Sequence, residues 1–262
     1  MATNAPAATS SNDGAGQQLP LFYGSLVPLS SQFHPNHGLK PRDNFAFAKV
    51  THAIPVTVDE FAIVQRHYPI VFGLGDNPAP LALVGLSEGQ NLYVDADGTW
   101  QAGSYIPAFV RRYPFMLAKL QENTQELSLC FDDTSGQVSA DADDKLFDGT
   151  EPTEATKSIL SFCEQFEQAV ARTRGFMDEL GKLDLLIDGE VTIQQPNMPE
   201  PAIYRGFRMV AEEKLQSIRG DQARKMVQNG MMGLVYAHLF GLAQIGGLFE
   251  KQAGMQAATV DA

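Results

Sequence analysis

Arginine and tyrosine recur at two matching places in this sequence. Residues 61–72 are FAIVQRHYPIVF and residues 105–117 are YIPAFVRRYPFML, so each place has an apolar stretch, an Arg, one further residue, Tyr-Pro and a second apolar run. Guanidinium groups bind carboxylates and phosphates through paired hydrogen bonds, and tyrosine hydroxyls add a donor. If the two places meet, they form an anion site. Its candidate ligand-binding residues are Arg66, Tyr68, Arg111, Arg112 and Tyr113.

The same arginines also have a structural interpretation. Each one follows a stretch with helical spacing, and a cation near the C-terminus of a helix is favoured by the helix dipole. In that position an arginine binds the last helix carbonyls or pairs with acidic residues. A ligand site and a capping role therefore both stay open, and no catalytic residue is assigned.

Two repeated units are expected to position these side chains. Proline biases the preceding residue away from the helical region, so Tyr68 and Tyr113 are expected where a helix ends and a strand begins. The runs that follow them are short and apolar, which is typical of buried strands. A further strand is expected after each, at Pro80–Leu86 and Glu126–Phe131. The pattern indicates an internal repeat of helix, Arg-x-Tyr-Pro corner and strand.

Around this repeat the sequence predicts an α+β or α/β fold, with a mixed or antiparallel sheet built from two related halves and long helices in the C-terminal half. Residues 1–18 are small and polar and are expected to form a disordered tail. Residues 19–250 form one domain that is sheet-rich over 19–131, has an acidic mobile loop over 132–150 and is helix-rich over 151–250, and residues 251–262 form a loose tail. The other expected elements are strands at Phe45–His52, Asn91–Val94, Leu185–Gln194 and Ala202–Val210, and helices at Thr153–Leu183 and Asp221–Gln228.

Composition narrows the classes of partner. The chain has 262 residues, of which 44% are hydrophobic, and a net charge of -12. Nucleic acids and anionic membranes bind basic surfaces, so neither is an expected partner. The two cysteines, Cys130 and Cys163, lie on different predicted elements and fit reduced core residues of a soluble, cytoplasmic protein better than a disulfide.

Most motifs for common chemistries are missing from the sequence. It has no Walker loop, no His-Glu-x-x-His and no Cys-x-x-Cys. Gly-x-Ser-x-Gly occurs once, at residues 85–89 (GLSEG), but a turn and a strand are expected after it, not the helix of a nucleophile elbow. His34 and His37 lack a partner set for a metal, and Asp95 and Asp97 fit a hairpin turn better than a calcium loop. No metal and no cofactor are therefore expected. Scattered histidines can still converge in space, so catalysis stays open, although a non-enzymatic role is favoured.

One stretch near the C-terminus is long enough to cross a bilayer. Residues 230–249 carry no formal charge but contain five glycines. Leu234, Ala237, His238 and Leu242 fall on one helical face, which favours a buried C-terminal helix over an integral membrane span. Whether this stretch contacts a membrane stays open.

Four segments together resemble the bacterial SapC family. They are 105–115 (YIPAFVRRYPF), 67–72 (HYPIVF), 89–98 (GQNLYVDADG) and 233–239 (GLVYAHL), and the resemblance extends over about residues 19–249. The family is associated with surface-layer formation, and its members are often labelled peptide-transport permeases. A permease needs several membrane spans, so that label fits this sequence badly. The resemblance implies an accessory role and supplies no catalytic residues.

Two functions follow as expectations. The first is a non-enzymatic binding or accessory protein with a protein or peptide partner, linked to surface-layer or peptide handling. The second is an enzyme or small-molecule-binding protein that holds an anionic ligand at the two corners. A deep pocket lined by the corner arginines favours the second, and a flat apolar patch favours the first.

Overall fold

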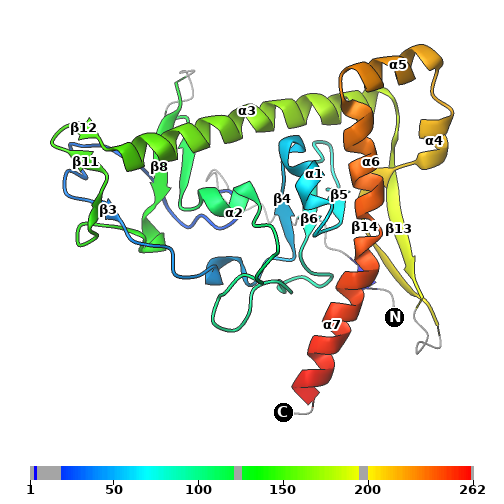
Figure 1. Cartoon of the computed structure of the whole chain (residues 1–262), viewed down its shortest axis with the longest axis horizontal. Helices are drawn as coiled ribbons and strands as arrows, with labels where there is room; N and C mark the ends of the chain where they lie inside the picture. Colours follow the sequence, from blue (N-terminus) through cyan, green and yellow to red (C-terminus); the bar gives the residue numbers. More distant parts are fainter. Residues whose placement is uncertain (1–2, 5–18, 121–125, 195–199, 261–262) are drawn as a thin grey trace.

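The computed structural model describes residues 3–4, 19–120, 126–194 and 200–260 and shows an α+β fold with several antiparallel sheets (Figure 1). The strands are β1 (Thr3–Asn4), β2 (Leu26–Pro28), β3 (Gly38–Leu39), β4 (Ala53–Pro55), β5 (Ile70–Phe72), β6 (Pro80–Leu83), β7 (Phe115–Ala118), β8 (Ser128–Asp132), β9 (Val138–Ser139), β10 (Asp144–Lys145), β11 (Phe147–Asp148), β12 (Glu151–Pro152), β13 (Leu186–Ile193) and β14 (Ala202–Val210). The helices are α1 (Phe61–Val64), α2 (Ala108–Arg112), α3 (Glu154–Lys182), α4 (Glu212–Gln216), α5 (Gly220–Gln228), α6 (Met231–Gly241) and α7 (Gln244–Val260).

Both repeated units have the predicted order of elements. The first runs from α1 through its corner to β5 and β6, and the second runs from α2 through its corner to β7 and β8. In each unit the two strands pair antiparallel. The expectation of one sheet made from both halves is corrected. β5 and β6 belong to a six-stranded sheet of order β1-β14-β5-β6-β4, with β13 on β14, whereas β7 and β8 belong to the three-stranded sheet β2-β8-β7.

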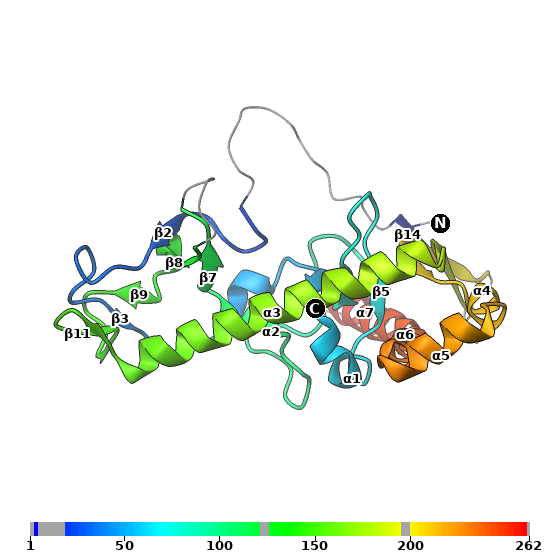
Figure 2. The ribbon, with the colours of Figure 1, turned by 90° about the horizontal axis from the view of Figure 1, so that it is seen from above.

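Helix α3 connects the two ends of the molecule. Thr153 accepts a hydrogen bond from the Thr156 N–H and so caps its start, as a threonine before a helix is expected to do. With 29 residues the helix is about 43 Å long. Figures 1 and 2 show it passing from the small sheets around β3, β8 and β11 to the end that holds α4, α5 and the β13–β14 hairpin. Its buried residues include Cys163, Phe166 and Leu180.

A buried glutamate joins the two repeated units. Glu60 ends the short 3-10 turn before α1, where its Oε2 accepts the Thr57 N–H at 3.1 Å in a capping box. Its Oε1 accepts the Ala108 N–H, at the start of α2, at 2.7 Å, and the Tyr105 hydroxyl at 3.0 Å. One carboxylate therefore holds the starts of both repeat helices together.

A buried histidine fixes the C-terminal helix to the sheet. His238 on α6 is fully buried; its Nε2 accepts the Val210 N–H at 3.0 Å, so its Nδ1 carries the proton and donates to the Ile70 carbonyl at 2.7 Å. Burial lowers the pKa of His238 from 6.5 to about 4, so the ring is neutral. By length and composition alone the helical stretch Met231–Met255 could cross a membrane, and a third of its apolar 18-residue window is buried against the rest of the chain.

Several local predictions need correction. The strand expected at Phe45–His52 is a 3-10 turn at Ala46–Ala48, started by the Asn44 side chain, which accepts the Ala46 N–H, and the strand comes later, as β4. Asn91–Val94 makes only an isolated bridge, between Val94 and Trp100. The acidic stretch 132–150 contains short strands, and α7 continues through most of the expected C-terminal tail. Of residues 1–18, all but Thr3–Asn4, which pair with β14, lie outside the described part.

Candidate functional site

The first corner is closed by packing. Tyr68 is fully buried; its hydroxyl donates to the Tyr105 carbonyl at 2.6 Å and accepts the Trp100 indole N–H at 3.1 Å. Arg66 is exposed, and its side chain makes no hydrogen bond or ion pair with the residues that the structure describes. Within the described part of the chain, this corner thus has a tyrosine hydroxyl with two partners and a solvent-exposed arginine, and neither residue lines the two hollows described below.

The second corner is anchored on a buried carboxylate. Tyr113 ends α2 and donates its hydroxyl to Asp132 Oδ2 at 3.0 Å. Asp132 also accepts the backbone N–H groups of Gly24 and Ser25, and both the N–H and the hydroxyl of Thr134. Burial alone would raise the pKa of Asp132, but these hydrogen bonds outweigh it, so the pKa lies below its usual 3.8. The anchor is therefore ionised at neutral pH.

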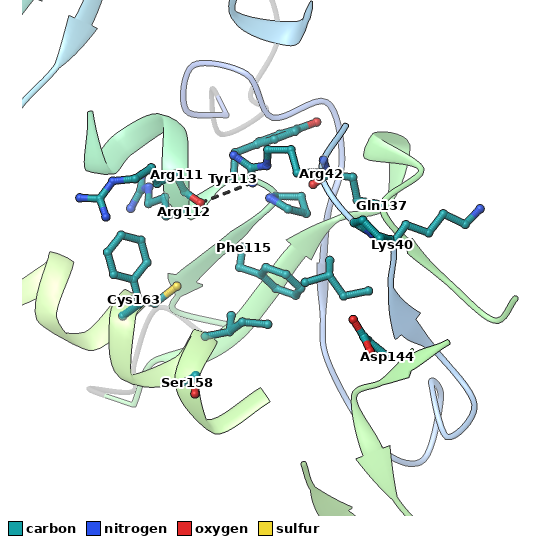
Figure 3. A pocket seen from close by; sticks show the side chains of 15 residues that line it. Lys40, Arg42, Arg111, Arg112, Tyr113, Phe115, Gln137, Asp144, Ser158 and Cys163 are labelled. Carbon is teal, nitrogen blue, oxygen red and sulfur yellow. Dashed lines mark hydrogen bonds between the residues drawn. The ribbon is translucent and has the colours of Figure 1, made fainter. Parts of the chain in front are cut away.

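A cavity of about 340 Å³ lies beside the second corner, between α2, α3, β7 and the chain around β3 (Figure 3). Figure 3 shows Arg111 and Arg112 at one end and Lys40 and Asp144 at the other, with Phe115 between them and Cys163 below the two arginines. It is lined by Leu39, Lys40, Pro41, Arg42, Arg111, Arg112, Tyr113, Pro114, Phe115, Gln137, Asp144, Ser158, Ile159, Phe162 and Cys163. Apolar side chains thus form its body and cations its rim, an arrangement common in ligand pockets.

Three guanidinium groups meet at this cavity. Arg42 donates to the Val110 carbonyl at 2.9 Å and the Arg111 carbonyl at 3.4 Å, so it caps the last turn of α2. Arg111 donates to the Ile106 carbonyl and the Tyr105 hydroxyl, each at 3.1 Å, and lies over the Phe162 ring. Both arginines therefore bind neutral oxygens, and neither has an ion-pair partner among the described side chains.

Arg112 is the buried member of this group. Its side chain is 6% exposed and lies over the Phe109 and Phe166 rings. Its contact with Glu167, at 3.4 Å, is long for a charge-assisted hydrogen bond, and its buried Nε has no hydrogen-bond partner among the residues that the structure describes. Arg112 thus pairs with an acidic residue, as the helix-capping interpretation predicts, and Arg111 binds a carbonyl just before α2. These contacts do not use all the hydrogen-bond donors and positive charge of the arginines at the cavity.

The cavity lacks the usual parts of a nucleophilic site. Burial raises the pKa of the Cys163 thiol to about 11, although Arg112 lowers it in part, so the thiol is neutral at physiological pH and a poor nucleophile. No histidine lines the cavity within the described chain. Among the described residues there is also no group of three His, Cys, Asp or Glu side chains placed to hold a metal.

A second hollow of about 390 Å³ continues from the cavity along α3. It is lined by Lys157, Ser158, Ser161, Phe162 and Gln165, and shares Ser158 and Phe162 with the first. Lys157 pairs with Glu154 at 2.8 Å, so its ammonium group is already compensated. The hollow extends the cavity with polar side chains but adds little free charge.

Of the five candidate residues, the structure brings three together. Arg111, Arg112 and Tyr113 line the cavity, whereas Arg66 and Tyr68 do not. Tyr105 links the two corners, because its carbonyl accepts a hydrogen bond from Tyr68 and its hydroxyl accepts one from Arg111. Sequence reasoning missed Arg42 and Phe162, and no local pattern marks either of them: one stands in a polar loop and the other on the apolar stripe of α3.

Comparison with known proteins places the chain in a family. The SapC family model matches residues 29–248, which is most of the sequence, so the chain belongs to the SapC family, as its motifs indicate. No curated protein matches it. No solved structure matches it either.

Proposed function

We propose that this SapC family protein is a binding protein, and that the cavity at the second corner holds the anionic group of a small amphipathic ligand. The observation that carries the proposal is the meeting of Arg42, Arg111 and Arg112 at one cavity, with a single long ion pair among them. A buried guanidinium with an unused donor is unfavourable, and a carboxylate or phosphate that accepts from it removes the penalty.

The lining indicates the rest of the ligand. Leu39, Phe115, Ile159 and Phe162 present apolar surface next to the cations, so an apolar or aromatic group fits beside the anionic one. A peptide C-terminus with a large apolar last side chain has both features. This chemistry agrees with the accessory role in peptide or surface-layer handling that the family resemblance implies, and that role remains part of the proposal.

Binding is favoured over catalysis because no base accompanies the available nucleophiles. Ser158 and Cys163 line the cavity, but within the described chain neither is hydrogen-bonded to a histidine or carboxylate that could activate it, and the Cys163 thiol is protonated. The cavity can recognise an anion without an evident route to transform it.

The test is a thermal-shift titration with matched probes. N-acetyl-phenylalanine, which carries a free carboxylate, should raise the melting temperature of the native protein, and its neutral amide should not. Arg111→Gln removes one cation from the rim but keeps a polar side chain where Arg111 donates to the Tyr105 hydroxyl at 3.1 Å. The variant should therefore fold and lose the ligand-induced rise in melting temperature. Equal shifts with the acid and the amide, or an unchanged shift in the variant, would contradict the proposal.

A further inference from the structure

The cavity at the second corner carries opposite charges at its two ends. Figure 3 shows Arg111 and Arg112 at one end and Asp144 at the other, with Phe115 between them. Among the residues that the structure describes, the Asp144 carboxylate has no hydrogen-bond or ion-pair partner. A ligand whose anionic group binds the arginines therefore has a carboxylate without a partner at its other end.

The lysines near this end do not neutralise Asp144. Lys40 Nζ pairs with Asp141 Oδ2 at 3.2 Å, and Figure 3 shows the Lys40 side chain running away from the arginines. Lys145 follows Asp144 on β10, so its side chain points to the opposite face of the strand. There its Nζ donates to the Asn36 carbonyl at 2.9 Å. This end of the cavity thus keeps a negative charge of its own.

Paired strands hold Asp144 at the cavity. β10 runs antiparallel to β3, where Asp144 lies opposite Leu39. A Cβ atom on Gly38 would lie 2.8 Å from the Asp144 carbonyl oxygen, so the glycine allows the two strands to approach this closely. β3 then continues into Lys40 and Pro41 of the cavity wall. The position of the carboxylate is therefore set by a sheet rather than by a free loop.

Two polar side chains line the cavity together with the apolar ones. Neither Gln137 nor Ser158 makes a side-chain hydrogen bond with the described residues. The Gln137 amide offers both a donor and an acceptor, which match the two polar atoms of a peptide group. Phe115 and Ile159 supply apolar surface for the body of a ligand.

We propose that the cavity binds a zwitterion whose ammonium group lies at the opposite end from its carboxylate, an inference that rests on the anion site proposed above. The carboxylate accepts from the arginines, and the ammonium group donates to Asp144. Short unblocked peptides and ω-amino acids share this chemistry. A single α-amino acid does not, because its ammonium group is one carbon from its carboxylate and is repelled by the same arginines.

Calorimetric titration with matched peptides tests the two ends separately. The probes have one, two or three glycines followed by phenylalanine, with a free or an acetylated N-terminus. For at least one length the free peptide should bind about threefold more tightly than the acetylated one, as expected of a partly exposed ion pair. Free phenylalanine should bind more weakly than N-acetyl-phenylalanine.

The outcomes separate this inference from the anion site. Acetylated peptides that bind as acids but not as C-terminal amides, with no gain from a free N-terminus at any length, would overturn the zwitterion and keep the anion site. Acids and amides that bind equally would overturn both.

Asp144→Asn tests the residue itself. It replaces an exposed carboxylate by an amide of the same shape, so the variant should fold and bind free and acetylated peptides equally. The matched control is Asp143→Asn, at an exposed neighbour that does not line the cavity, and it should keep the threefold difference. A difference that persists in Asp144→Asn, or one lost equally in both variants, would overturn the role of Asp144.

A second pair of probes separates the two sources of ligand. 6-Aminohexanoic acid and hexanoic acid differ only by the ammonium group, and neither has a peptide group for Gln137. Tighter binding from the ammonium group in the glycyl peptides alone supports a peptide ligand. An equal gain in 6-aminohexanoic acid supports an ω-amino acid in the same orientation.

Discussion

The two Arg-x-Tyr-Pro corners share a sequence pattern but differ in what surrounds them. At the first, Tyr68 is sealed by Trp100 and Tyr105, and the following strand β5 is covered by α6. At the second, the Tyr113 hydroxyl donates a hydrogen bond to Asp132, and a cavity of about 340 Å³ lies beside the corner. The first strand joins a six-stranded sheet and the second a three-stranded one (Figure 1).

This difference shows how one local pattern serves two purposes. Tyrosine followed by proline sets where the helix ends and the strand begins in both units. The surroundings of each corner then differ: α6 packs against the first corner through Gly241 and His238, whereas the second keeps cations without an ion-pair partner among the described side chains. We propose that the first corner is structural and that the second binds ligand.

The largest effect is expected from removing the anchor of the second corner. Asp132→Asn leaves one carbonyl oxygen to accept the hydrogen bonds of five donors, so it should lower the free energy of unfolding by about 4 kcal/mol. Urea denaturation measures the loss. Asp133→Asn, at the exposed neighbouring carboxylate, is the control and should change stability by less than about 0.5 kcal/mol. A similar small loss for both variants would show that Asp132 is not an anchor.

As pH falls, the stabilising contribution of His238, which packs at the first corner, should be lost before that of Asp132 at the second corner. The folded pKa of His238 is about 4 against an ordinary 6.5, so the unfolded state binds the proton more readily. Its neutral form stabilises the fold fully above pH 6.5, and this contribution is lost as pH falls toward 4, by about 3 kcal/mol in total. Asp132, with its lowered pKa, contributes above pH 3.8 and loses its effect only below that value.

Urea midpoints measured between pH 7 and pH 4 test this order. His238→Gln removes the titrating ring, so most of the native slope should disappear in this variant. The burial of His52 and His34, whose pKa values are also lowered, leaves a smaller slope of the same sign. Native and variant proteins with equal slopes would show that His238 is not the acid-sensitive group.

Replacing each corner tyrosine by phenylalanine should cause smaller losses of stability, and the two losses should differ. Tyr68→Phe leaves a buried carbonyl and the Trp100 N–H without partners, so it should cost about 2 kcal/mol of stability. Tyr113→Phe removes one of five donors to Asp132, so it should cost about 1 kcal/mol. Thermal denaturation of the pair gives the comparison. A larger loss at Tyr113 would reverse the contrast between the corners.

The sequence could predict the repeat because its signals are local. The Tyr-Pro pairs, the apolar runs and the Thr153 cap each act within a few residues, and the elements they predict are present. Family membership was visible for the same reason, since it depends on short motifs.

The surroundings of the corners could not be predicted, because they come from distant parts of the chain. Asp132 stands in an acidic run that indicates a solvated loop, yet its partners Gly24 and Ser25 are 108 and 107 residues away. Arg42 reaches α2 from a separation of 68 residues. Such contacts depend on the tertiary fold, and nothing in the local pattern of Arg66 distinguishes it from Arg111.

The most direct test of the account locates a ligand in the crystal. N-acetyl-4-bromophenylalanine has a carboxylate, an aromatic body and a bromine whose anomalous scattering marks its position. One strong bromine peak is expected in the cavity at the second corner, among Leu39, Phe115 and Ile159, with the carboxylate on Arg111 or Arg42. A peak beside Arg66, or binding in solution with no peak in the cavity, would contradict the claim that only the second corner holds ligand.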